Sequence, residues 1–301
     1  MSSGIGLGEL VAKVAERRPL HARFIQDAYQ FLVPAEREEA DQYVGHLLET
    51  LSLEFIAESY ETIVDDTFEA QLFFMKEGRY QYSKFEEVAH SVYFNPEYMK
   101  RYMVGLAVSN YLWPNHVQIR RFFAETFPWQ RDGDYCEIGP GHGLFLLQAM
   151  RASALQRFTG LDISASSLAL TDEAVRKSLP ERRERLRLIE ADFLAPGHDV
   201  GGPYDVVVMG EVLEHVEQPL AFLQRLHELA APGAHVFVTT CVNAPAIDHI
   251  SLFAAEQDVE NLIAQAGFTI QRQLSIPYGG KTLKQCVSGR LPINVAYVLS
   301  P

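Results

Sequence analysis

The spacing of apolar residues changes character near residue 130. Before that point apolar side chains recur at helical spacing, as in the set Leu47, Leu48, Leu51, Phe55 and Ile56. Comparable faces cover 84–94 and 116–127. Pro96, Pro114 and Pro128 are expected at helix starts or stops, because proline lacks an amide donor and clashes inside a helix. The first 128 residues are therefore predicted to be mostly helical.

After residue 130, short β-branched runs alternate with helix-forming stretches. The runs lie at 134–138, 158–162, 186–190, 204–209 and 234–240. The helical stretches between them lie at 143–153, 165–178 and 217–230. A helix over 256–266 and strands over 268–276 and 294–299 complete the pattern, and Ala231–Ala234 is expected to form a turn. Strands that alternate with helices predict an α/β fold with a parallel sheet wound on both faces.

Composition narrows the class of partner. The chain of 301 residues is 48% apolar and 22% charged, with a net charge of −13. It lacks the positive field that would attract nucleic acid or an anionic membrane, so neither is an expected partner. The segment 36–69 holds eleven acidic residues against Arg37 alone, which is typical of a solvated helical face.

The sequence also bears on location and redox state. The N-terminus has no signal-peptide pattern and no apolar run approaches membrane-spanning length, so a cytoplasmic protein is expected. Cys136, Cys241 and Cys286 form no CxxC pair and are expected to be reduced structural thiols. The oligomeric state stays open, with a homodimer among the options.

The sharpest chemical signal follows the first predicted strand. Residues 136–143 read CEIGPGHG and lead into the helix-forming run LFLLQAM. Glycines in such a turn let a ligand approach the backbone amides of a helix N-terminus. The dinucleotide pattern G-x-G-x-x-G fails, because its last position falls on Leu144. The spacing G-x-G-x-G behind Glu137 is the form expected of enzymes that use S-adenosylmethionine (SAM).

Later strand ends agree with this interpretation. The second strand ends at Asp162, where an acid suits ribose hydroxyls. The third ends before Asp192 and Phe193, a carboxylate and an aromatic face suited to adenine. The fourth leads into GEVLEHVEQP at 210–219.

With these motifs in order, residues 130–301 resemble a class I SAM-dependent methyltransferase. The EVLEHV segment resembles the small-molecule branch that includes ubiquinone and menaquinone biosynthesis enzymes and natural-product tailoring enzymes. The resemblance implies a Rossmann-like, mostly parallel, seven-stranded sheet over 129–301. It also implies that the N-terminal all-α domain, residues 1–128, forms a substrate-binding cap.

The resemblance assigns SAM, the implied cosubstrate, to residues at the strand ends. It places Glu137 near the ammonium group, with Gly139 and Gly141 beside the methionine moiety. It places Asp162 at the ribose and Ile163 against the adenine. The remaining positions, with roles at the adenine and beneath the reacting end, are Asp192, Phe193, Gly210 and Glu211.

Two missing motifs narrow the acceptor. Enzymes that methylate nucleobase amines usually carry an Asn/Asp-Pro-Pro-aromatic motif after strand four, and this chain has none there. The magnesium-dependent catechol-type enzymes carry an adjacent Asp-Asn pair, and this sequence contains no such pair. Glu211, Glu214 and His215 could form a metal site, but the EHV segment resembles that of metal-free relatives, and no metal is expected.

Aromatic residues concentrate between Tyr60 and Trp129. Most of these seventeen side chains fit a helix–helix core, but the segment 110–116, NYLWPNH, combines polar tips with a proline break. Aromatic faces attract cations such as the sulfonium of SAM. We expect the segment to close over the sulfonium and the acceptor, through Tyr111, Trp113, Asn115 and His116.

The candidate general bases are His116, His142, His215 and His249, since an oxygen or nitrogen acceptor often must lose a proton as it attacks the methyl carbon. His249 ranks first because it lies in the loop after strand five, which borders the acceptor pocket in such enzymes, as does Asn243. His215 ranks second, and His142 is expected to contact the cosubstrate.

The leading function is methyl transfer from SAM to a small metabolite or natural product. One alternative closes the aminocarboxypropyl arm of SAM on itself, as in azetidine-2-carboxylate synthases, and releases methylthioadenosine. It would require a cap that seals SAM without room for a second substrate. The other alternative is a non-catalytic SAM-binding partner subunit.

Overall fold

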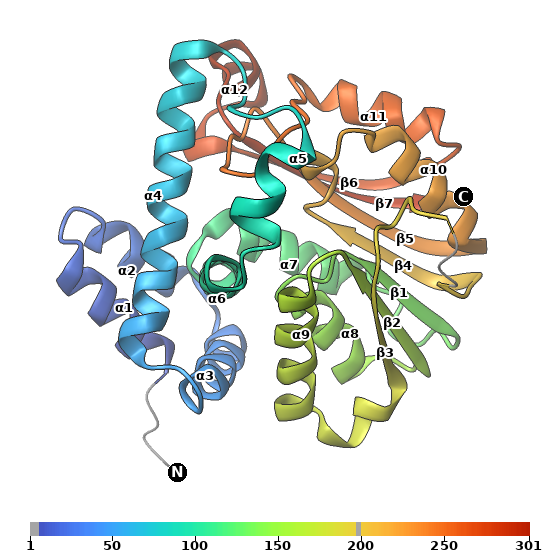
Figure 1. Ribbon diagram of the computed structural model, residues 1–301, viewed down its shortest axis with the longest axis horizontal. Helices are drawn as coiled ribbons and strands as arrows, with labels where there is room; N and C mark the ends of the chain where they lie inside the picture. The colour runs from blue at the N-terminus through green and yellow to red at the C-terminus, as the bar shows by residue number, and fades with distance from the viewer. Residues whose placement is uncertain (1–5, 197–199) are drawn as a thin grey trace.

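The computed structural model describes residues 6–196 and 200–301 and centres on a seven-stranded sheet (Figure 1). The strand order is β3-β2-β1-β4-β5-β7-β6, and only β7 runs antiparallel to its neighbours. The strands are β1 (Asp134–Ile138), β2 (Arg157–Asp162), β3 (Leu186–Glu190), β4 (Tyr204–Gly210), β5 (Ala230–Val242), β6 (Thr269–Pro277) and β7 (Ile293–Ser300). This architecture confirms the predicted mostly parallel, doubly wound α/β fold.

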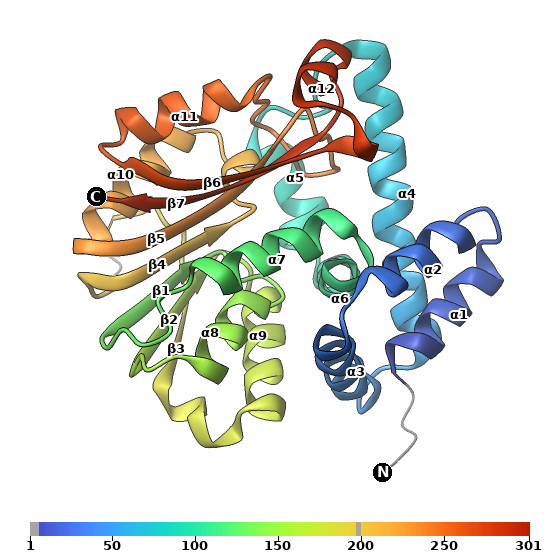
Figure 2. The same cartoon turned by 180° about the vertical axis from the view of Figure 1, so that it is seen from behind.

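Helices cover both faces of the sheet because β-strand side chains alternate between the faces. Helices α7 (Pro114–Thr126), α8 (Leu144–Ala152) and α9 (Ala165–Ser178) belong to one side. There, Phe123 of α7 packs on Phe145 of α8 and Phe237 of β5, with ring centroids 4.8 and 5.0 Å away. Helices α10 (Pro219–Leu229) and α11 (Glu256–Gln265) cover the other side (Figure 2).

The N-terminal helices lie beside the carboxyl ends of the parallel strands (Figure 1). They are α1 (Leu7–Arg17), α2 (Ala22–Phe31), α3 (Pro34–Leu48), α4 (Leu53–Glu77), α5 (Phe85–Val88), a π-helical turn (Ala89–Tyr93) and α6 (Pro96–Leu112). Helices α4 and α6 cross closely at Gly105, where an added Cβ would lie 2.3 Å from the backbone oxygen of Ser59. We call α1–α6 the cap.

The cap and the sheet share one hydrophobic core. A continuous set of buried side chains runs from Leu7 of α1 through Tyr111 of α6 to Val298 of β7. Buried Arg120 of α7 pairs with Glu39 of α3 at 2.7 Å and adds a polar link. The domain boundary is expected at residue 128. Helix α7 lies before that residue, in the part expected to be the cap, and yet it packs on the sheet.

Most predicted elements match the structure closely. Pro96 and Pro114 each begin a helix, and Pro128 follows the end of α7. The pattern missed the short helix α12 (Leu283–Gly289), and it placed a turn at 231–234 where β5 already runs. The acidic segment 36–69 is only partly a solvated face, since several of its carboxylates pair with basic residues, including Arg17 and Arg121. Among the described helices, none has the length and apolar character needed to cross a membrane.

Candidate functional site

A cavity of about 1400 Å³ separates the cap from the carboxyl ends of the strands. Side chains at the ends of β1, β2, β4 and β5 form its floor, and α4, α6 and the start of α7 supply the opposite wall. Small-molecule sites usually occupy roughly 300–1,000 Å³. This cavity therefore has room for two substrates side by side.

The glycine turn after β1 adopts a backbone that favours glycine. Gly139 and Gly141 have φ values of 68° and 54°, in the left-handed region. A Cβ on Gly139 would lie 2.7 Å from Cγ2 of Val212, so a side chain there would also clash. Both residues line the cavity, and the next glycine, Gly143, caps α8.

Glu137 lies on the cavity floor in a buried setting. Its side chain is 2% exposed, and the Tyr135 hydroxyl donates a 2.6 Å hydrogen bond to Oε2. Burial raises the pKa of Glu137 to about 8; the Tyr135 hydrogen bond opposes this shift, and the charge of Asp162 adds to it. A cationic ligand group here would offset the cost of the buried charge.

Asp162 ties the end of β2 to the glycine turn. Its Oδ2 accepts from the amide of Gly141 at 3.2 Å, and its Oδ1 accepts from the amide of Ser164 at 2.9 Å. Burial raises its pKa to about 6, although these backbone donors favour the charged form. Ile163 lines the cavity beside it.

The residues after β3 form an edge of the same cavity. Phe193 is buried and packs on Phe222 of α10 with ring centroids 5.3 Å apart. Asp192 is exposed, and its Oδ1 accepts from the amide of Leu194 at 2.9 Å. Both residues line the cavity.

Glu211 follows β4 in a strained conformation. Its φ is 52°, an uncommon value for a residue with a side chain. Its amide donates to the backbone oxygen and the hydroxyl of Thr239, at 3.1 and 3.0 Å. Burial raises the pKa of Glu211, and one carboxylate oxygen, Oε1, is buried with no hydrogen-bond partner among the described residues. The cavity thus contains an unsatisfied acceptor next to Gly210, another lining residue.

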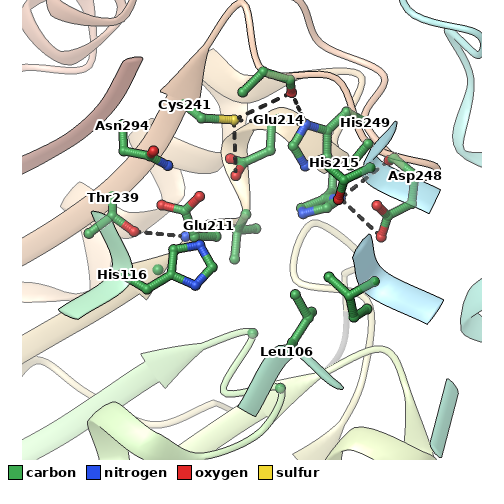
Figure 3. A pocket seen from close by; sticks show the side chains of 18 of the residues that line it. Leu106, His116, Glu211, Glu214, His215, Thr239, Cys241, Asp248, His249 and Asn294 are labelled. Carbon is green, nitrogen blue, oxygen red and sulfur yellow. Dashed lines mark hydrogen bonds and ion pairs between the residues drawn. The ribbon is translucent and has the colours of Figure 1, made fainter. Parts of the chain in front are cut away.

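Two histidines and a carboxylate lie together across the cavity from His116 and Asn294 (Figure 3). His215 Nδ1 lies 3.3 Å from Oδ2 of Asp248 and 3.2 Å from its backbone oxygen. His249 Nδ1 lies 2.6 Å from the backbone oxygen of Ala244. Burial lowers the pKa of His249 to about 3, so this imidazole is neutral.

Side chains of the types that can bind a metal ion lie close together in two overlapping groups. Glu214, Cys241 and His249 bring donor atoms within 4.8 Å of one another, as do His215, Asp248 and His249. Protein hydrogen bonds already use several of these atoms, including Nδ1 of His249 and the carboxylate of Asp248. Burial also raises the pKa of the Cys241 thiol well above its usual value, with a further contribution from Glu214. The absence of a metal stays a prediction.

The cap segment 110–116 only partly faces the cavity. Trp113, Asn115 and His116 line it; Trp113 Nε1 donates to the Tyr60 hydroxyl, and Asn115 donates to Asn294 of β7. Tyr111 instead lies fully buried in the shared core, where the Arg120 guanidinium stacks 4.5 Å from its ring. We therefore assign Tyr111 no catalytic role.

Asn243 also lies outside the cavity lining. Its φ is 49°, and its side-chain amide donates to the backbone oxygen of Ala254 at 2.9 Å. Asn243 shapes the loop after β5 rather than contacting a ligand.

Sequence reasoning missed three residues of the site. Tyr93, Tyr102 and Asp248 line the cavity and contact one another through the Asp248 carboxylate. The tyrosines precede Asp248 by 155 and 146 positions, so no local spacing connects them. The only local signal was that Asp248 directly precedes His249.

Comparison with known proteins identifies the family of the chain. A family model described as a methyltransferase domain matches residues 115–273, slightly more than half of the chain. This chain belongs to the methyltransferase-domain family. The match begins at the start of α7, in line with the packing of that helix on the sheet. Membership in this family supports SAM as the cosubstrate.

Individual relatives match over shorter spans. A ubiquinone biosynthesis O-methyltransferase of Vibrio cholerae is 34% identical over 104 residues, 35% of this chain and 40% of the relative. One from Psychrobacter arcticus is 24% identical over 177 residues, 52% of this chain and 67% of the relative. The chain thus spans about two fifths of the length of the first relative.

Among solved structures, the mitomycin 7-O-methyltransferase MmcR superposes with a TM-score of 0.54 at 14% identity. The alignment covers 86% of this chain and 72% of MmcR. At this identity the likeness shows a shared fold.

Proposed function

We propose that this chain transfers the methyl group of SAM to an ionisable oxygen or nitrogen of a small-molecule acceptor. The observation that carries this proposal is the cavity of about 1400 Å³, which joins the strand ends that would hold SAM to a histidine-lined wall beneath the cap. SAM supplies an electrophilic methyl group on a sulfonium. The protein aligns the acceptor with it and excludes water.

The residues present fit this cosubstrate. The glycine turn presents its backbone to the cavity at Gly139 and Gly141, where side chains would be strained. Glu137 offers a buried carboxylate for the ammonium group, and Glu211 has a free acceptor atom beside the reacting end. Asp162 would bind the ribose and Ile163 the adenine face. The other predicted cofactor contacts, Asp192 and Phe193 at the adenine and Gly210 under the methionine arm, line the same cavity.

The geometry favours His215 over His249 as the base that takes the acceptor proton. Because the pKa of His249 is lowered to about 3, this imidazole is a weak base at neutral pH. His215 keeps 19% of its side chain exposed. Its Nδ1 faces two acceptors of Asp248, so Nδ1 carries the proton and Nε2 is the basic atom. Trp113, Asn115 and His116 would form the cap side of the acceptor pocket.

A small acceptor agrees with the charge of the protein. A net charge of −13 and a cap rich in carboxylates oppose the binding of a nucleic-acid backbone. The size of the cavity also disfavours cyclisation of the SAM arm, which needs no second substrate.

Incubation of the pure protein with SAM alone, followed by mass spectrometry, tests the proposal first. Bound but unreacted SAM, or slow formation of S-adenosylhomocysteine, is the expected outcome. Methylthioadenosine above the uncatalysed background would overturn methyl transfer in favour of reaction at the aminocarboxypropyl arm. A panel of small phenols, carboxylates and amines, with tRNA as the macromolecular control, then identifies the acceptor through methylated product.

A further inference from the structure

Asp248 connects the cap to the part of the cavity wall that holds His215 and His249. We call this set of contacts the Asp248 junction. Its side chain is 1% exposed and lies in the loop after β5. Tyr93, at the end of the π-helical turn, donates to Oδ2 at 3.0 Å, and Tyr102 of α6 donates to Oδ1 at 3.0 Å. His215, in the turn after β4, approaches Oδ2 at 3.3 Å. Three segments distant in sequence therefore meet at one carboxylate.

The contacts fix the direction of each hydrogen bond. The Asp248 carboxylate and its backbone oxygen can only accept, so the two hydroxyls and the Nδ1–H of His215 must donate. Two tyrosine donors on opposite oxygens hold the carboxylate plane against rotation. The carboxylate plane in turn sets the orientation of the imidazole.

The charge around Asp248 adds a second effect. Within the described parts of the chain, no lysine or arginine forms an ion pair with Asp248, whereas His215 does when it is protonated. A buried carboxylate without a fixed cation stabilises an imidazolium that forms beside it. The titratable groups that face this pair include Tyr93, Tyr98, Tyr102 and Asp66 of the cap, Glu211 and Glu214 after β4, Cys241 near the end of β5, and His249 of the same loop.

We propose that Asp248 is a positioning residue for methyl transfer: held by Tyr93 and Tyr102 of the cap, it orients His215 and stabilises the imidazolium formed when Nε2 takes the acceptor proton. The inference rests on the proposed function. In the step itself, the acceptor O–H or N–H bond breaks, its proton moves to Nε2, and the acceptor lone pair forms the new bond to the methyl carbon. The C–S bond pair of the sulfonium remains on sulfur.

Variants of the Asp248 junction test the proposal, with the acceptor that the substrate panel identifies. Asp248→Asn should lower kcat about 100-fold, within the 10²–10⁴ range of general acid–base effects, while the Kd for SAM stays within about twofold. In a His215→Gln background the same substitution should add less than about threefold, because both changes remove one function. Additive losses, or an unchanged kcat in Asp248→Asn, would overturn the proposal.

The tyrosines offer a matched control. Tyr93→Phe combined with Tyr102→Phe should approach the Asp248→Asn loss, because both donors that hold the carboxylate are gone. Tyr98→Phe removes the same group from α6, but the Tyr98 hydroxyl donates to Asp66. Tyr98→Phe should therefore keep the wild-type kcat. An equal loss in Tyr98→Phe would mean that cap packing alone matters. The tyrosine variants also keep the test open if Asp248→Asn fails to fold.

A measurement without turnover separates this inference from the proposed function. In a sample labelled with ¹⁵N-histidine, the neutral imidazole of His215 should carry its proton on Nδ1 in the wild type and in Tyr98→Phe, and Asp248→Asn should shift the proton toward Nε2, because an amide can donate to Nδ1. An unchanged tautomer in Asp248→Asn would refute the coupling even if methyl transfer occurs. If the tautomer changes but no acceptor is methylated, the coupling stands and the proposed reaction fails.

Discussion

Glu137 gives the most quantitative test of how the cavity would bind SAM. Because burial raises its pKa to about 8, Glu137 is mostly neutral at pH 7 before ligand binds. A cosubstrate ammonium beside it requires the carboxylate. Binding at pH 7 should therefore release a proton.

The pH dependence follows from the same value. Between pH 6.2 and 7.4 the Kd of the wild type for SAM should fall by about tenfold per pH unit, because less work is needed to deprotonate Glu137. The window lies above the pKa of Asp162, about 6, so Glu137 dominates the change. In Glu137→Gln the side chain still accepts from Tyr135, but it has no proton to release. The Kd of that variant should vary little over this range.

Isothermal titration calorimetry in two buffers of different ionisation enthalpy measures both quantities. At pH 7.4 the variant should also bind more weakly, because a charged hydrogen bond contributes about 1.5–3 kcal/mol and the cost of deprotonating Glu137 offsets only part of it. Glu190→Gln is the control, because Glu190 is exposed at the end of β3, which lies beyond β2 from β1, and does not line the cavity. A wild-type Kd that is flat with pH, with no proton release, would refute the placement of the ammonium group at Glu137.

Three further substitutions test other parts of the structure. Asp162→Ala should raise the Kd for SAM at least about tenfold by calorimetry, because charged hydrogen bonds to the ribose are lost; unchanged affinity in a folded variant would remove Asp162 from the ribose site. Trp113→Ala should lower turnover, whereas Tyr111→Phe should leave it unchanged because that hydroxyl lies in the core; if neither variant differs from the wild type, Trp113 has no role in the site. Gly105→Ala should reduce the urea unfolding free energy by about 1–3 kcal/mol, because its Cβ would lie 2.3 Å from the Ser59 oxygen. Gly45→Ala is its control, since an added Cβ there meets nothing within 4 Å and should be neutral or stabilising; an equal loss would contradict the packing argument.

The α/β half could be predicted because its signals are local. Each strand is a short apolar run, and the glycine turn and Asp162 follow strand ends directly, so parallel topology brings them to one edge of the sheet. The sequence carries both the element and its chemistry in a few adjacent residues. For Glu137, Gly139, Gly141 and Asp162, position in the chain was enough to predict a shared cavity.

The cap could not be predicted to the same depth. Helix α6 is buried on nearly all sides, so its apolar pattern does not reveal which face meets the cavity. Tyr102 and Tyr111 look alike in sequence, yet one reaches Asp248 and the other packs on Arg120. Only the tertiary packing of α6 between α4 and the helices α7 and α9 decides this.

The cap also reaches the cosubstrate side of the cavity. Asn110 of α6 lies 3.0 Å from Nε2 of His142 in the glycine turn, and the sulfur of Met103 would lie 3.4 Å from a Cβ on Gly141. Helix α6 thus contacts the glycine turn through Met103 and Asn110 and the Asp248 junction through Tyr102. An acceptor that moves α6 must also move contacts to the SAM loop. Binding of the two substrates should therefore be coupled, with the coupling transmitted through a single helix.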